Sequence, residues 1–330
     1  MSARVTAVRP GWAIEGGLIT IEGTGFPVDQ PELPGVLIGG ARARPVYASS
    51  TAIGVLVPAG LEGGQAALSI GGEDAGVTVG VAAAFATGLH QVDNPVFDRQ
   101  GNLYVTYSGT RGQEVPVSIF RVRPNGTRET FSSGIVNATS MAFDPEGRLY
   151  VSSRFEGTVY RVDEDGAFES FATDLGVACG LAFAEDGTLF VGDRSGTLFR
   201  VDRQGKAAPF ASIPPSVAAF HLAMAPDGGL YVTAPTLSAY DSVYRVAPDG
   251  TVSTVADSFG RPQGIAFDAS GSALVVEALA GVSGLYRLRP RQPPELLLAG
   301  PGLVGVAVDP SGGLVVCSNE TAYRAMTPRM

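Results

Sequence analysis

The sequence predicts an all-β protein, and three features support this fold class. Glycine makes up 44 of the 330 residues, about 13% against an average of about 7%. Charged residues make up only 17% of the chain, below the usual ~25%, which does not suit long exposed helices. The third feature is an apolar run that ends in a glycine-containing turn and recurs along the chain, a pattern typical of short strands joined by tight hairpins.

The first part of the chain predicts a small β-sandwich. Glycine and proline separate five strand-like runs, at residues 5–9, 18–22, 35–38, 53–57 and 66–70. In the second run Leu18, Thr20 and Glu22 alternate with two isoleucines, as in a strand with one buried face. Short strands at this spacing are typical of an immunoglobulin-like sandwich.

The same region also resembles the IPT/TIG domain family. The segment VTAVRPGWAIEGGLITIEGTGF is followed in order by VLIGG, IGVLVPAG and AALSIGG. These segments carry the family's proline after the first strand, its Gly-Gly pair, its glycine-rich strand end and its Val-Pro segment. The resemblance implies an immunoglobulin-like domain over residues 1–80. It implies a role in spacing, docking or carbohydrate-associated binding, and no catalytic residues.

Residues 81–330 contain six copies of one pattern, of which SMAFDPEGRLYV and GLAFAEDGTLFV are two. The turn glycines lie 40 to 46 residues apart, at Gly101, Gly147, Gly187, Gly228, Gly271 and Gly312. Six copies at this period predict a β-propeller of six four-stranded blades. Glycine supplies the positive φ of a tight hairpin, and the acidic residues beside it are turn formers rather than calcium ligands.

The last copy ends before a fourth strand. The segment GVAAAFATGL at residues 80–89 resembles GAFESFATDL at residues 166–175, where a fourth strand is expected. We therefore expect residues 82–88 to supply the outer strand of the last blade. Pairing the two parts of the chain would remove the exposed strand edges of an open ring.

The repeats resemble six-bladed propellers of the NHL and gluconolactonase/regucalcin-like families, most closely in RPQGIAFDASGSALVV and CGLAFAEDGTLFVGD. That resemblance implies one divalent metal, held in the central channel by residues of three blades. The aligned positions are Asp93, Thr139, Cys179, His221 and Gln263, so Asp93 is the single carboxylate carried over. One carboxylate makes a poor Ca²⁺ cage, while Cys179 and His221 would favour a softer metal or serve as buried core residues.

The candidate ligand-binding residues are polar side chains expected to line the channel, and Asp93 is the candidate metal ligand. They are Asp93, Asn94, Thr139, Arg154, Asp193, Arg194, His221, Gln263, Glu277 and Asn319. Two interpretations stay open. In one, Asp193 or Glu277 pairs with an arginine across a hydrated channel; in the other, these residues form a pocket for a small acid, sugar or peptide.

Charge and hydropathy exclude some classes of binding partner for this protein. The net charge of −9 disfavours nucleic acid, and no apolar run is long enough to span a membrane. Cys179 and Cys317 lie in different repeats and are expected to be buried thiols rather than a disulfide. The N-terminus does not read as a signal peptide. We therefore expect a cytoplasmic monomer, or an extracytoplasmic one if a signal has been removed.

The motifs that the sequence has and lacks favour a binding function over a catalytic one. The sequence carries no nucleophile elbow or phosphate loop, and only His221 is expected near the channel. This favours a non-catalytic binding or scaffold propeller without a cofactor, which recognises a protein, glycan or small polar ligand at the channel face. The long loops at residues 108–117 and 235–242, with Arg111 and Tyr240, would take part. The alternative is a divergent gluconolactonase-like, metal-dependent lactone or ester hydrolase with its site near Asp93.

Overall fold

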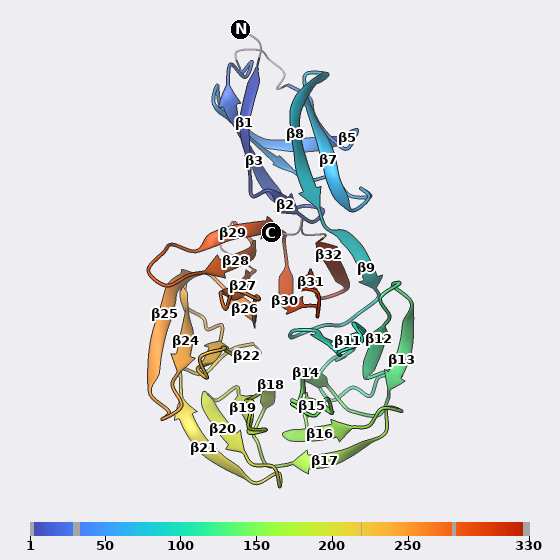
Figure 1. Cartoon of the computed structure of the whole chain (residues 1–330), viewed down its shortest axis with the longest axis vertical. Helices are drawn as coiled ribbons and strands as arrows, with labels where there is room; N and C mark the ends of the chain where they lie inside the picture. Colours follow the sequence, from blue (N-terminus) through green and yellow to red (C-terminus); the bar gives the residue numbers. More distant parts are fainter. Residues whose placement is uncertain (1–2, 29–33, 219, 279–281, 326–330) are drawn as a thin grey trace.

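The computed structural model describes residues 3–28, 34–218, 220–278 and 282–325. All the regular secondary structure named in these ranges is β-strand. A β-sandwich sits on one side of a ring of small sheets (Figure 1). The predicted all-β class is therefore confirmed. Over the same ranges no helix has the length and hydropathy needed to cross a membrane.

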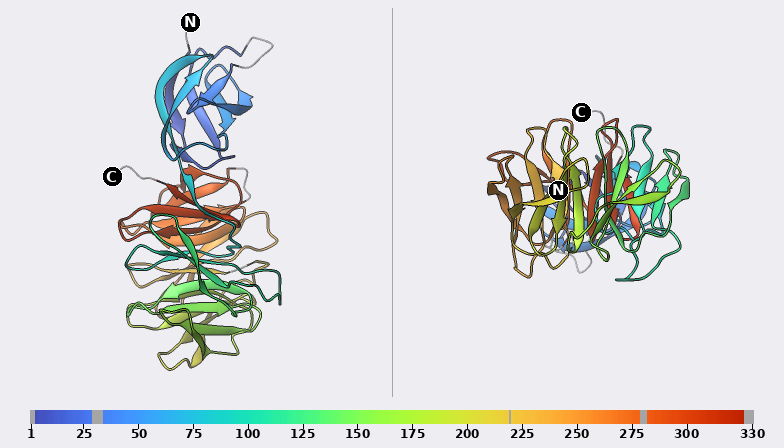
Figure 2. Two further views of the ribbon diagram at one scale, coloured as in Figure 1. Left: turned by 90° about the vertical axis from the view of Figure 1, so that its right-hand side faces the viewer. Right: turned by 90° about the horizontal axis from the view of Figure 1, so that it is seen from below.

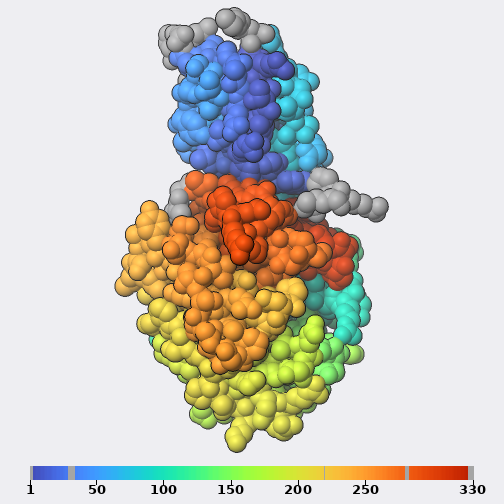
Figure 3. All heavy atoms as spheres, turned by 60° about the vertical axis from the view of Figure 1, so that its left-hand side comes forward, coloured from blue at the N-terminus to red at the C-terminus, as the bar shows by residue number. Residues whose placement is uncertain are grey.

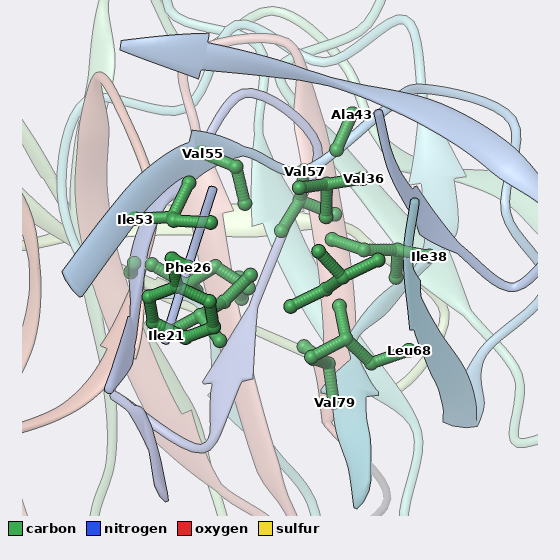
Figure 4. Close-up of a cluster of buried hydrophobic side chains, with 14 residues drawn as sticks. Ile21, Phe26, Val36, Ile38, Ala43, Ile53, Val55, Val57, Leu68 and Val79 are labelled. Carbon is green, nitrogen blue, oxygen red and sulfur yellow. The ribbon is translucent and has the colours of Figure 1, made fainter. Parts of the chain in front are cut away.

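The N-terminal module has two facing layers that share strand β5. The start of β5 pairs with β4, and residues 44–48 pair with β6, so this strand carries the chain from one layer to the other. Apolar side chains of both layers point toward one another between them (Figure 4). The strands are β1 (Arg4–Arg9), β2 (Trp12–Ala13), β3 (Leu18–Thr24), β4 (Val36–Ile38), β5 (Ala41–Ala48), β6 (Ala52–Leu56), β7 (Gly64–Ile70) and β8 (Glu73–Val81).

The five predicted strands of this module are present as β1, β3, β4, β6 and β7, and three further strands were not predicted. β5 alternates alanine with arginine and contains Pro45, so it lacks an apolar stripe. β8 begins with two acidic residues and contains Gly76. β2 has only two residues. In all three, pairing with neighbouring strands overrides weak local preference.

The ring contains five separate four-stranded sheets, each with strands in sequence order from the axis outward, except that the last takes its outer strand from β9. The first blade is β10 (Val96–Phe97), β11 (Leu103–Thr106), β12 (Ile119–Val122) and β13 (Arg128–Ser132). The second is β14 (Ala138–Phe143), β15 (Leu149–Ser153), β16 (Thr158–Val162) and β17 (Phe168–Ala172). The third is β18 (Ala178–Phe183), β19 (Leu189–Asp193), β20 (Thr197–Val201) and β21 (Ala207–Ser212). The fourth is β22 (His221–Met224), β23 (Leu230–Thr233), β24 (Asp241–Val246) and β25 (Val252–Phe259). The closing blade is β30 (Leu303–Val308), β31 (Leu314–Ser318), β32 (Thr321–Ala325) and β9 (Ala83–Thr87).

The fifth repeat departs from the prediction of six separate blades. Its strands β26 (Pro262–Phe267), β27 (Ala273–Glu277), β28 (Gly284–Leu288) and β29 (Glu295–Ala299) have the same antiparallel order. They belong, however, to a twelve-stranded sheet that continues into the N-terminal module. The cause is β2, in which Trp12 pairs with Leu298 of β29 on one side and with Gly80 of β8 on the other. The sandwich accordingly rests directly on this part of the ring (Figure 3).

Closure of the ring follows the prediction. β9 pairs with β32 in antiparallel register, from Thr87 opposite Thr321 to Ala83 opposite Arg324. The amide of Leu89 extends the ladder by donating to the carbonyl of Glu320. The strand that leads out of the sandwich is thus the outer strand of the closing blade.

Turns gather on two opposite faces of the ring (Figure 2). One face, here called the hairpin face, carries the turns between first and second strands and between third and fourth strands. The other, the loop face, carries the turns between second and third strands and the connections from one blade to the next. Both long loops, residues 108–117 and 235–240, belong to the loop face because each follows a second strand.

Candidate ligand site at the loop face

The centre of the ring is filled by the chain itself. The segment that leads into the first blade lies against the inner strands of the fifth repeat and the closing blade, where Asn94 donates to the carbonyl of Ile265 at 2.8 Å and accepts the amide of Val306 at 3.0 Å. Gly305 makes room for this segment, because a Cβ there would lie 2.6 Å from the carbonyl oxygen of Asp93. Both polar atoms of the Asn94 side chain, a predicted ligand-binding residue, are therefore bonded to the backbone.

Asp93, His221 and Gln263 form one buried hydrogen-bonded group. His221 Nδ1 lies 2.5 Å from Asp93 Oδ1, and His221 Nε2 lies 3.0 Å from Gln263 Oε1. The same carboxylate oxygen accepts the amide of Asn94 at 2.6 Å. Asp93 and His221 belong to the first and fourth units of the ring, so their bond ties opposite sides of the channel together.

Two further predicted residues also hold the backbone. The buried Thr139 hydroxyl donates to the carbonyl of Asn137 at 2.7 Å. The Asn319 side chain donates to the carbonyl of Gln91 at 2.9 Å and thereby fastens the segment that leads into the first blade to the closing blade. Both side chains therefore help to hold the backbone near the channel.

Asp193 and Glu277 occupy equivalent positions in the third and fifth repeats, and each accepts a backbone amide of a nearby connection. The Asp193 carboxylate accepts the amide of Val177 at 2.8 Å and the hydroxyl of Ser195. The Glu277 carboxylate accepts the amide of Arg261 at 2.9 Å. Each binds the connection that enters its own blade. For Asp193, these bonds replace the arginine partner across the channel that the first interpretation required.

Cys179 lies at the base of a charged group near the channel mouth. Burial raises the pKa of its thiol to about 12, and the negative charge of Asp93 acts in the same direction. The positive charges of Arg154 and Arg194 oppose that shift, which brings these two predicted residues into the surroundings of Cys179. Because the thiol stays protonated at neutral pH, it is a poor nucleophile and a poor metal ligand.

Arg154 and Arg194 have no carboxylate partner among the residues that the structure describes. Neither takes part in an ion pair there, and the one side-chain hydrogen bond of Arg154 runs to the carbonyl of Gly109 at 3.3 Å. Burial lowers the pKa of the Arg154 guanidinium, and the charges of Arg194 and Arg111 lower it further. Arg154 therefore lies within reach of the charges of two further arginines, one from the turn of the preceding blade and one from the turn of the next.

The arginines elsewhere in the propeller contrast with this group. Each repeat has one arginine on its third strand, and most of these pair with a carboxylate, as Arg121 does with Glu129 and Arg245 with Asp227. Arg324 stacks on the ring of Phe85 instead, 3.8 Å from its centroid. These arginines bind outer strands or hairpin-face turns of the propeller, whereas Arg154 and Arg194 form no ion pair in the described residues.

Asn137 positions the loop that carries Arg111. Its side chain donates to the carbonyls of Ser108 and Thr110 at 2.6 and 2.8 Å and accepts the amide of Gly112 at 2.6 Å. The sequence analysis did not select Asn137. Its place at the entrance to an inner strand was the signal that would have found it.

The donor set does not fit the metal that the gluconolactonase-like resemblance implies. Ca²⁺ takes six to eight oxygen ligands, whereas Asp93 offers one carboxylate already bonded to His221 and Asn94. The Cys179 thiol and the Thr139 hydroxyl add no anionic oxygen. Across the described ranges no three His, Cys, Asp or Glu side chains are grouped to hold an ion.

Two clefts lie on the hairpin face, away from every predicted site residue. One of about 690 Å³ lies between the first and second blades, and one of about 520 Å³ between the third and fourth. The charged groups of the larger cleft are largely satisfied by one another: Arg148 pairs with Asp144 and Glu146, and Asp98 accepts from Asn102 and two backbone amides. Such a cleft offers few free groups for recognition, so the loop face is the stronger candidate.

Comparison with known proteins supports the two modules. Residues 3–85 match the IPT/TIG domain family, and no curated protein matches the chain. An auxiliary nutrient binding protein from Bacteroides thetaiotaomicron has a similar structure, with a TM-score of 0.60, 13% identity and 98% of each chain covered. A gluconolactonase from Xanthomonas campestris has a TM-score of 0.60 and 14% identity over 79% of this chain and 89% of its own. At these identities the likeness to solved structures shows the fold alone, and the IPT/TIG family is shown only for residues 3–85.

Proposed function

We propose that the chain is a non-catalytic binding protein whose propeller recognises a small polar ligand at the loop face. The observation that carries this proposal is the group of Arg154 and Arg194, which lies at the channel mouth without a carboxylate partner among the described residues. An arginine desolvated without a partner is costly, and a bound ligand that accepts its hydrogen bonds would remove that cost. The auxiliary nutrient binding protein of similar fold is consistent with a binding role.

The chemistry around Asp93 favours binding over catalysis. A nucleophile needs an adjacent base and access to substrate, but Asp93 and His221 are buried and bonded to each other. The Cys179 thiol is protonated because burial raises its pKa to about 12. In this proposal Asp93, His221 and Cys179 have a structural role near the arginines, and the protein carries no resident metal.

A thermal-shift screen tests the proposal. The panel contains sugars, lactones, small carboxylates, short peptides and divalent cations, and the proteins are the wild type and the Arg154→Gln/Arg194→Gln double variant. We expect at least one class of small polar molecule to raise the melting temperature of the wild type and not of the variant. Arg203→Gln is the control, because Arg203 lies on the hairpin face and donates only to the carbonyl of Asp186.

The same protein tests the hydrolase alternative, which the gluconolactonases of similar fold represent. Elemental analysis of the purified chain and assays with lactones, with and without Ca²⁺, are compared with those of Asp93→Asn. Stoichiometric metal and lactone hydrolysis that both disappear in Asp93→Asn would overturn the binding proposal. Equal melting shifts in wild type and the double arginine variant would also contradict it.

A further inference from the structure

The loop-face arginines adjoin neighbouring loops of the propeller. Arg154 reaches the carbonyl of Gly109 in the loop that carries Arg111. On the other side, the carbonyl of Arg194 accepts the amide of Ser216, and Ser216 and Val217 both donate to Pro235 in the second long loop. These contacts link the first blade to the second and the third to the fourth, and the charge of Arg194 acts on Arg154 between the two pairs.

The charge of this site opposes that of the molecule. The whole chain has a net charge of −9, yet the positive charges of Arg194 and Arg111 both act on Arg154 here. The nearest carboxylate in the sequence, Asp193, is already bonded to an amide and a hydroxyl. An anion bound beside Arg154 would relieve the repulsion that Arg194 and Arg111 exert on it, and the planar guanidinium matches the two oxygens of a carboxylate.

An unsatisfied buried hydroxyl lies in the loop that Arg154 contacts. The side chain of Ser108 is fully buried, and its Oγ has no hydrogen-bond partner in the described parts of the chain. Ser108 directly precedes Gly109, which Arg154 contacts. Buried hydroxyls without a partner are uncommon in folded proteins, so this one is a second, independent sign of a missing acceptor or donor.

Exposed apolar side chains lie in several loop-face connections, and one of them adjoins Arg154. Of the large hydrophobic residues that are exposed, half lie in loop-face connections, including Phe155, Val217, Leu237 and Tyr240. Leu237 is 90% exposed and Tyr240 is 69% exposed. Phe155 follows Arg154 directly and lies against Gly112 of the Arg111 loop. A ligand held by the arginines would meet apolar surface beside them.

We propose that the loop-face site binds a small organic carboxylate with an apolar body, its carboxylate between Arg154 and Arg194 and its apolar part against the Phe155 side. This inference rests on the proposed function and specifies the ligand class. The overall negative charge disfavours polyanions, which would meet repulsion outside the site. A small monoanion satisfies the arginines without that cost.

Matched acid and amide pairs test this inference. The probes are acetate and acetamide, hexanoate and hexanamide, and phenylacetate and phenylacetamide, with inorganic phosphate as a further anion, each titrated into the whole chain by calorimetry. We expect hexanoate or phenylacetate to bind at least about tenfold more tightly than its amide and than acetate. Arg154→Gln and Arg194→Gln should each weaken that binding about tenfold or more, while Arg203→Gln leaves it unchanged.

The apolar contribution has its own variant. Phe155→Ser should reduce the preference for phenylacetate over acetate while acetate binding stays the same, since the arginines are intact. Equal affinity for acid and amide, or tighter binding of phosphate than of any carboxylate, would overturn the carboxylate assignment and leave loop-face binding standing. Failure of every panel compound, neutral or charged, to bind in an arginine-dependent way would overturn the proposed function itself.

Discussion

At the scale of single residues, the reactivity of the Cys179 thiol distinguishes a structural role for this residue from a catalytic one. Burial raises the pKa of its thiol to about 12, so the thiolate is scarce at neutral pH. We predict no reaction of native Cys179 with an aromatic disulfide reagent between about pH 7 and 9, where an ordinary thiol of pKa ~8.5 ionises. The control is the unfolded chain in denaturant, which should react at both cysteines. Rapid native reaction would mean that the thiol is accessible and activated.

Gly305 tests whether the chain fills the centre of the ring. A methyl group there would meet the backbone of Asp93 at 2.6 Å, so Gly305→Ala has to displace the segment that leads into the first blade. We predict a loss of about 1–3 kcal/mol in the free energy of unfolding, measured by denaturant titration. Gly35→Ala is the matched control, since no atom lies within 4 Å of its added methyl group. Equal stability of the two variants would show that the centre is open.

Residue-level chemistry was only partly predictable from the sequence. Arg154, Asp193 and Glu277 were found because they follow second strands, a place that repetition fixes. Their partners were not: Asp193 binds a backbone amide of the connection before its own blade, and no sequence pattern states which amide is left unpaired. The bond from His221 to Asp93 joins residues 128 positions apart and depends on ring geometry alone.

At the scale of elements, the strand β9 closes the ring. Deleting residues 1–89 removes this strand and exposes the edge of β32, whereas deleting residues 1–81 keeps it. We predict that the longer deletion melts about 5–10 °C below the shorter one, equivalent to ~2–3 kcal/mol for a domain of this size. Scanning calorimetry of both truncations measures the difference. Coincident melting of the two would mean that β9 contributes nothing to closure.

The elements that were predicted well are those with repetition or an apolar stripe. The glycine turn recurs in every repeat, and the resemblance of residues 80–89 to a fourth strand located β9 in advance. β5 and β8 were missed because their sequences lack a clear apolar stripe, although both pair with strands next to them in the chain. β2 has only Trp12 and Ala13, and its partners Gly80 and Leu298 lie far along the chain.

At the scale of the whole molecule, the two modules form one continuous structure. β2 and β9 join the sandwich to neighbouring parts of the ring, one to β29 and the other to β32. Because the sandwich is attached through these strand pairings, the loop face is formed by the turns and connections of the propeller. A rigid scaffold that presents loops from several blades is a common arrangement for a binding site.

The central claim is that a small ligand binds at the loop face, and hydrogen–deuterium exchange tests it most directly. The whole chain is compared with and without the panel compound that raises its melting temperature most. We predict slower exchange in the loop at residues 108–117 and in the turns after Ser153 and Asp193, with unchanged exchange in the hairpin-face turn at residues 144–147. Protection confined to the hairpin-face clefts would contradict the account.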